Sequence, residues 1–428
     1  MDRRSFIKST ACAAGLFCMT DWQEAWARGK KDSEVGKTFA GWKKGQFQVH
    51  FIYTGVSESM FYIFPDGTTM LLDCGDHNAI GRGKLAVPVL PHADRHSGEW
   101  IARYVLRVNP AGKDVDYMML SHYHSDHGGC AGFNAGVVEH DDGPYPLSGF
   151  SQAAEYLNFG KAFDRAWPTY DDPIPLASDP DGWAHIKRFY EYMSAHRGLK
   201  VEKFRVGENN QIAMLHNASK YPNFRVHNLC ANGRICGEDG EIRDLYAERI
   251  ARDNPKTLNE NGMSLGMIFS YGPFRFYTAG DFSDGWNLPD GTHFEIEDAM
   301  AEVCGRAQVA KVNHHGHYSM PAKLLQALQS RVYVSCVWDQ LHNVPPVVER
   351  ISDRALYPGD RILCPGIMPK ERVEEAAGAG WLKDIPEPAF EGCHTVLTVE
   401  KGGKDYSITL IGASDESMKV RSVLRFKS

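Results

Sequence analysis

The stretch 121–129, SHYHSDHGG, places three histidines and one aspartate within six residues. It directly follows the apolar run VDYMML (115–120), which has the character of a short buried strand. Side chains alternate in direction along an extended segment, so we expect His122 and His124 to point the same way. This stretch therefore predicts a rigid loop that presents imidazoles from the end of a strand.

The glycine pair that closes the stretch turns the chain, which lets Asp126 and His127 face a neighbouring position. We predict a dinuclear layout, with His122 and His124 on one ion and Asp126 and His127 on a second. Neutral imidazole and carboxylate suit Zn²⁺, and also manganese or iron. The alternative is a polar turn after a buried strand, in which this spacing has no chemical role.

Two further apolar runs end in residues with metal-ligand chemistry. FRFYTAG (274–280) leads into Asp281, and QVAKVN (308–313) leads into His314 and His315. Ligands at the ends of neighbouring strands can converge on one edge of a sheet and be held rigidly. We therefore expect these residues to meet the histidine loop.

Together these motifs resemble the signature of the metallo-β-lactamase superfamily over roughly residues 47–320. The resemblance implies an αββα fold, in which two mixed sheets pack face to face with helices outside and the site at one edge. It also implies roles for three residues beyond the histidine loop. Asp73 in LLDCG would orient that loop, Asp281 would bridge two ions, and His315, next to Gly316, would be the last ligand. His314 would then lie behind a ligand or face the substrate.

Three segments are similar to the metallo-β-lactamase domain of the ComEC-type competence protein. They are FIYTGVSESMFYIFPDGTTMLLDCG (51–75), NENGMSLGMIFSYGPFRFYTAGD (259–281) and KVNHHGHYS (311–319). The sequence departs from that branch at Glu58, where the branch has aspartate, and at His317, where it has serine.

The remaining ligand of the first ion has several candidates. His216 and His227 are histidines in the interval where the superfamily places another ligand, although a histidine inside a strand is more often a packed core residue. Asp281 is the third candidate.

Candidate substrate contacts are Arg165, Lys311 and Ser319, with His314 as a catalytic candidate beside Asp126 and Asp281. Arg165, Lys311 and His314 would counter charge on a phosphoester. The alternatives are a loop salt bridge for Arg165 and a solvated strand-edge position for Lys311. His342, near Pro345-Pro346, could line the mouth of the pocket, but a structural turn is the preferred interpretation.

The N-terminus resembles a twin-arginine (Tat) signal, with Arg3-Arg4 before a modestly apolar run and small residues before a possible cleavage after Ala27. We therefore expect a signal at 1–27, a polar lead-in at 28–46, and one metallo-β-lactamase-like domain at 47–428. A long insertion at about 131–260 would form the wall that sets specificity. The expected location is the periplasm or another exported compartment; a basic cytosolic tail is the alternative.

Composition is that of an ordinary globular protein, with 43% hydrophobic residues in 428 and a net charge of -7. The negative charge gives no general attraction to nucleic acid or anionic membrane. No apolar run approaches the ~20 residues that span a bilayer. Cys12 and Cys18 lie in the predicted signal; of the other eight cysteines, only Cys230 and Cys236 are close enough to suggest a local disulfide.

We therefore expect an exported hydrolase in which a hydroxide held by two zinc ions attacks a phosphodiester. Its substrate would be a small or oligomeric ester, such as a nucleic-acid fragment, a nucleotide or an envelope phosphoester. One alternative is a lactonase or another ester or amide hydrolase on the same site. A second is a metal-binding recognition protein without turnover.

Overall fold

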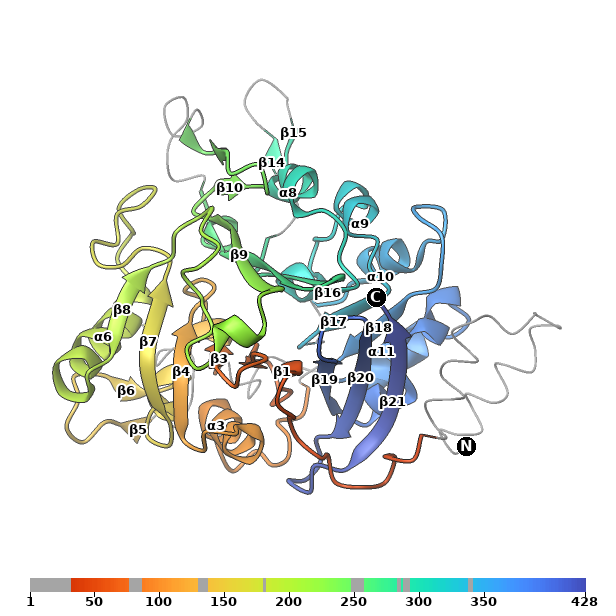
Figure 1. Ribbon diagram of the computed structural model, residues 1–428, viewed down its shortest axis with the longest axis horizontal. Coiled ribbons are helices and arrows are strands. Elements are labelled where there is room, and N and C mark those ends of the chain that lie inside the picture. Colours follow the sequence, from red (N-terminus) through yellow and green to blue (C-terminus); the bar gives the residue numbers. More distant parts are fainter. Residues whose placement is uncertain are drawn as a thin grey trace.

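The computed structural model describes residues 32–76, 87–129, 138–179, 182–247, 258–282, 286–287, 293–337 and 342–428 (Figure 1). The predicted signal at 1–27 lies outside the described residues. Among the described helices, none combines the length and apolar character that crossing a bilayer requires.

Two mixed sheets pack face to face between outer helices, which confirms the predicted αββα fold (Figure 1). Within the described residues, the first sheet has nine strands in the order β21 (Val420–Lys427), β20 (Asp405–Gly412), β19 (Cys393–Val399), β1 (Phe47–Phe51), β2 (Met60–Ile63), β3 (Thr69–Leu72), β4 (Asp114–Met119), β7 (Asn158–Asp164) and β8 (Lys200–Lys203). The second has eight described strands in the order β11 (Ile242–Asp244), β10 (Arg234–Cys236), β9 (Phe224–Ala231), β12 (Gly266–Tyr271), β13 (Phe274–Ala279), β16 (Val309–Lys311), β17 (Val332–Ser335) and β18 (Ile362–Pro365).

Smaller elements complete the described fold. Two strand pairs lie apart from the main sheets, β5 (Val138–Glu139) with β6 (Pro146–Leu147) and β14 (Trp286–Asn287) with β15 (His293–Phe294). The α-helices are α3 (Ser97–Val108), α4 (Ser125–Gly128), α5 (Phe150–Ala153), α6 (Trp183–Arg197), α8 (Ile296–Cys304), α9 (Ala322–Leu328), α10 (Pro345–Ser352) and α11 (Lys370–Glu375). Short 3₁₀ turns are η1 (Ala218–Lys220), η3 (Asn261–Met263), η4 (Asn313–Gly316), η5 (Gly380–Asp384) and η6 (Glu387–Phe390).

The side chains of strand β1 illustrate how the two sheets pack against each other. Its side chains alternate between the two faces of the sheet: Phe47 lies in the core between the sheets, whereas His50 faces outward and contacts Tyr104 of α3. Phe269 of the second sheet stacks on Phe47 and on Tyr62, with ring centroids 5.4 and 5.0 Å apart. Aromatic residues from both sheets therefore form one continuous core.

Helix α3 covers the outer face of the first sheet, and α6 lies on the same side. Buried residues of α3 recur at helical spacing and form one apolar stripe, as the sequence predicts: Trp100, Ile101, Tyr104, Val105 and Val108. Helices α8, α9 and α10 lie on the opposite outer side (Figure 1). The sandwich thus has four layers, with both sheets covered.

The interval 131–260, which the sequence presents as an insertion, supplies strands to both sheets. Strands β7 and β8 extend the first sheet, and β9, β10 and β11 extend the second. Cys230 and Cys236 are both buried free thiols, so the suggested disulfide between them is absent. Residue Cys230 pairs across the β9–β10 hairpin with Ile235 instead of with Cys236.

Strand direction explains where polar side chains gather. Strands β3, β4 and β7 run parallel, and so do β13 and β16. The carboxyl ends of parallel strands meet at one edge of a sheet. Asp73 and His122 follow β3 and β4, while Asp281 and His315 follow β13 and β16. Each sheet therefore delivers its own polar residues to a shared edge.

We expect Phe269→Ala to lower the free energy of unfolding by about 3–5 kcal/mol, because it leaves a cavity between the sheets. Ile242→Ala is the control, since Ile242 is 52% exposed and Phe269 is 0% exposed. Chemical denaturation of both variants measures the difference. Equal stability losses would contradict the assignment of Phe269 to the core that joins the sheets.

Candidate metal centre

The histidine loop leaves β4 and enters the short helix α4. His122 and His127 are fully buried, and their rings lie 4.2 Å apart between centroids. The Nε2 atom of His122 lies 3.1 Å from Nδ1 of His124. The predicted pairing of His122 with His124 is thus present in the geometry.

Asp281 of the second sheet lies at the centre of the cluster. Its Oδ2 atom is 3.0 Å from Nε2 of His127 and 3.2 Å from Nε2 of His315. The same oxygen is 3.9 Å from Nε2 of His122. Asp281 therefore faces both halves of the histidine loop.

Asp126 closes the cluster from the first sheet. Its Oδ2 atom is 3.3 Å from Nε2 of His315 and 4.0 Å from Nε2 of His127. Its side chain is 19% exposed, whereas those of His127 and His315 are 0% exposed. The structure thus brings together all six residues that the sequence proposes as ligands: His122, His124, Asp126, His127, Asp281 and His315.

Asp73 lies behind His127 rather than in the cluster. Its Oδ2 atom is 2.8 Å from Nδ1 of His127, and its two oxygens also accept hydrogen bonds from the backbone and hydroxyl of Ser121 at 2.7 Å each. With Nδ1 donating to Asp73, Nε2 of His127 carries the lone pair that faces Asp281. Asp73 therefore holds both the position and the tautomer of the ring.

Glu58 and Lys311 form a buried ion pair beside His315. The Lys311 ammonium is 2.8 Å from Oε1 of Glu58, and both side chains are 0% exposed. Oε2 of Glu58 is 3.1 Å from Nδ1 of His315. The sequence analysis noted Glu58 only as a departure from the ComEC-type pattern, which has aspartate there, and gave it no role.

The donor set fits divalent cations. Ring nitrogens of His127 and His315 lie 3.2 Å apart, and those of His122 and His124 lie 3.1 Å apart. Two lone pairs at such separations repel unless a proton or a cation lies between them. Nitrogen and carboxylate ligands are those that zinc, manganese and iron accept in proteins.

Comparison with known families bears on the first half of this site. Residues 53–186 match the family model of the metallo-beta-lactamase superfamily. Over this segment the chain is similar to that superfamily. No curated protein matches the sequence. The matched segment includes Asp73 and the histidine loop, while Asp281 and His315 join them through the fold. A buried histidine–carboxylate cluster in a chain with this similarity indicates a metal-dependent hydrolase.

The electrostatics of the cluster also favour a bound cation. Burial alone lowers the pKa of His127, but Asp281, Asp73 and Asp126 outweigh it and hold that pKa well above its ordinary value. Burial likewise opposes ionisation of Asp281, yet His127 and His315 keep its pKa well below its usual range. The cluster therefore holds excess negative charge, which protons or metal ions neutralise.

His314 lies beside the cluster in a separate environment. It and His315 adopt left-handed backbone angles, with φ of 45° and 48°, so their rings diverge. Its Nε2 atom is 3.2 Å from the amide nitrogen of Asn261, and burial lowers its pKa to about 4. A neutral imidazole with Nδ1 free of hydrogen bonds to the described residues is available to a substrate.

His342 lies beside the cluster, although the sequence favours a structural turn over a pocket position for it. Its ring lies 4.8 Å from that of His315, and only 6% of the residue is exposed. The following residue, Asn343, donates its backbone N–H to the carbonyl of His315 at 2.8 Å. The interpretation of this segment as a mere turn was therefore incomplete, because the turn packs against the cluster.

The predicted substrate contacts Arg165, Lys311 and Ser319 are all buried in the structure. Arg165 donates from Nε to Oε1 of Glu260 at 2.9 Å, and the same oxygen accepts the backbone N–H of Tyr123 at 2.9 Å. Lys311 pairs with Glu58, as described above. The Ser319 hydroxyl donates to the carbonyl of Asn313 at 2.6 Å. Arg165 thus supports the histidine loop from behind.

Neither His216 nor His227 joins the cluster. His227 bonds through its two ring nitrogens to Asn209 and to the carbonyl of Cys236. His216 is about half exposed beside Asp116, with the side chain 51% exposed. Of the three candidates for the remaining ligand, only Asp281 lies among the other donors.

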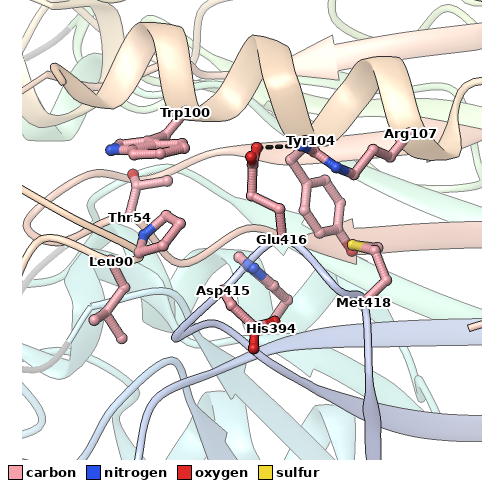
Figure 2. Close-up of a pocket in the computed structure, with 10 residues that line it drawn as sticks. Thr54, Leu90, Trp100, Tyr104, Arg107, His394, Asp415, Glu416 and Met418 are labelled. Carbon is pink, nitrogen blue, oxygen red and sulfur yellow. Dashed lines mark ion pairs between the residues drawn. The ribbon is translucent and has the colours of Figure 1, made fainter. Parts of the chain in front are cut away.

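A separate pocket lies between α3 and the first sheet and shares no residue with the cluster. Figure 2 shows Trp100 and Tyr104 above it and His394 and Met418 below. Its volume of about 20 Å³ holds roughly one water molecule. This pocket is therefore too small for the substrate of a hydrolase.

The metal-free protein should be most stable near pH ~6.5, the ordinary histidine pKa. Carboxylates raise the pKa of His127 and His315 in the folded state above the ordinary histidine value. The stability that the two protonated rings give the folded protein is therefore complete below the ordinary pKa, and it is lost as the pH rises through their raised pKa values. Burial lowers the pKa of His50 and His394 to about 3. The folded protein holds these two rings neutral, so it loses stability as the pH falls below the ordinary histidine pKa.

Thermal unfolding of chelator-treated protein between about pH 5 and about pH 9 checks this balance. Added zinc should remove the loss on the alkaline side, because it replaces protons on the imidazoles. A melting temperature of the metal-free protein that rises throughout this range would contradict the assignment of charge to the cluster.

Proposed function

We propose that this chain is an exported, dinuclear metal-dependent hydrolase that cleaves phosphodiesters. The observation that carries the proposal is the convergence of six nitrogen and carboxylate donors from two sheets at one edge, where four of the six are buried: His122, His127, Asp281 and His315. The twin-arginine-like segment supports export. A lactonase or other ester hydrolase on the same site is the principal alternative.

The donors divide between two ions. His122 and His124 would hold the first, and Asp126, His127 and His315 the second, since the last three lie within 4.0 Å of one another. Asp281 would lie between the ions, because its Oδ2 faces His122 as well as His127. Zinc is the ion that this mixture of imidazole and carboxylate suits best, with manganese or iron as alternatives.

When bound, two such cations lower the pKa of a shared water and stabilise negative charge on the ester. The residues around them supply position and proton transfer. Asp126 is the carboxylate best placed to take a proton, because its side chain is 19% exposed and that of Asp281 only 2%. Neutral His314 would donate a hydrogen bond from Nδ1 to a substrate oxygen.

Charge at the site supports a diester over a monoester. Arg165 and Lys311 both form ion pairs with carboxylates of the protein, Arg165 with Glu260 and Lys311 with Glu58. A phosphodiester carries a single negative charge, which two divalent cations neutralise without a further cationic side chain. The motifs shared with the ComEC-type domain, and the absence of a net positive charge, favour small diesters such as nucleotides, nucleic-acid fragments or envelope phosphoesters.

We expect the zinc-loaded protein to hydrolyse bis-p-nitrophenyl phosphate, and His124→Ala to reduce kcat/KM by more than about 100-fold, beyond the usual effect of residues behind a ligand. The matched control is His196→Ala, which removes an exposed histidine of α6. Chelation should abolish the activity, and zinc should restore it.

Nitrocefin and a panel of lactones distinguish the alternative. Turnover of a lactone without turnover of the diester would replace phosphodiesterase by lactonase. A zinc-loaded protein that hydrolyses no ester in the panel would contradict both, and would leave metal-dependent recognition as the function.

A further inference from the structure

The Glu58–Lys311 pair occupies the space between the two sheets, directly behind the cluster. Glu58 belongs to the loop between β1 and β2 of the first sheet, and Lys311 ends β16 of the second. Removing two charges from water is costly, and apolar residues of similar size often stabilise a core as well as a buried ion pair does. Stability alone therefore gives no reason for charge at these positions.

Glu58 is fixed to the first half of the site through its backbone. Its N–H donates to the carbonyl of Asp126 at 2.7 Å, and its carbonyl accepts the N–H of Gly75 at 3.1 Å. Its carboxylate reaches across to the second half, where Oε2 lies 3.1 Å from Nδ1 of His315. The same residue thus touches the histidine loop and the last histidine.

Lys311 is fixed to the strand end that carries Asp281. Its ammonium donates to the carbonyls of Ala279 and Gly280 at 2.9 and 3.2 Å. It lies 3.6 Å from Oδ1 of Asp281, on the side of the carboxylate away from the oxygen that faces the histidines. Oε1 of Glu58, 2.8 Å away, is the carboxylate oxygen nearest to this ammonium among the ion pairs described.

We propose that Glu58 and Lys311 are positioning residues, which hold the site residues of the first sheet and those of the second sheet in the correct relative position. Glu58 holds His315 through Nδ1, so that Nε2 faces Asp126, His127 and Asp281. Lys311 holds Glu58 in place and fixes the backbone and the outer oxygen of Asp281. Glu58 thereby does for His315 in the second sheet what Asp73 does for His127 in the first.

Glu58 also lies close enough to His127, Asp281 and His315 to be considered a direct ligand. The charge distribution argues against that role. An ion between Glu58 and Nδ1 of His315 would adjoin the Lys311 ammonium, whereas an ion at Nε2 of His315 has two aspartates as neighbours. Repulsion between cations therefore places the metal on the Nε2 side.

Three variants separate positioning from folding: Glu58→Gln, Lys311→Met and the uncharged double variant Glu58→Gln/Lys311→Met. Zinc affinity is measured by competition with a chromophoric chelator, and melting temperature is measured on the metal-free protein. We expect Glu58→Gln to weaken zinc binding by roughly 10- to 100-fold. Lys311→Met should lower the melting temperature most, because it leaves a carboxylate buried alone.

The double variant decides the question. It should recover most of the melting temperature lost in Lys311→Met while its zinc affinity stays at least about 10-fold below wild type. Recovery of both properties would overturn the proposal, since the pair would then be only structural. A fall from two bound zinc ions to one in Glu58→Gln would also overturn it and make Glu58 a ligand.

Glu202→Gln is the matched control, because Glu202 forms a lysine ion pair of the same 2.8 Å length with Lys161 in the exposed part of the first sheet. It should leave zinc affinity unchanged. These measurements need no turnover, so a wild-type protein that binds zinc but hydrolyses no diester would end the proposed phosphodiesterase function and leave this inference standing. A wild-type protein that binds no zinc would end both.

Discussion

Buried negative charge is the constraint on which this structure depends. Four carboxylates, those of Asp73, Asp126, Asp281 and Glu58, gather where the two sheets meet, and one buried ammonium faces them. Such a concentration is tolerable only when protons or cations compensate it. In the metal-free protein the carboxylates raise the pKa values of His127 and His315, so that protons on these rings compensate the negative charge. The chemistry of the site and the stability of the fold are therefore two consequences of one charge balance.

Sequence reasoning predicted the site well where chemistry followed the strand pattern. His122, Asp281 and His315 each come directly after an apolar run, and parallel strands bring such ends together. The sandwich itself was expected from the resemblance to a known superfamily, because the spacing of apolar residues indicates single strands and helices but not how they pack. Resemblance to a known superfamily supplied what spacing could not, namely that Asp73 orients rather than ligates.

The predictions failed where a side chain's role depends on a partner far away in the sequence. Arg165 looks like a loop cation until Glu260 is seen to neutralise it. Glu58 and Lys311 are 253 positions apart by their own numbers, and only the packing of two sheets makes them neighbours. The sequence favoured a turn over a pocket position for His342, because its contact with His315 arises through a turn held by backbone hydrogen bonds. Contacts between residues far apart in the sequence produce no periodic pattern, so the sequence alone does not reveal them.

The division of donors between the two sheets also has a consequence for metal selection. An unfolded chain holds His122 and His124 near each other, but it cannot bring Asp281 and His315 to them until both sheets have formed. The complete coordination sphere is thus a product of folding, and the chain takes its ions in the compartment where folding ends. For a protein exported already folded, as proposed for this chain, that compartment is the cytoplasm. The ion that serves the enzyme outside would then be chosen by the metal supply inside the cell.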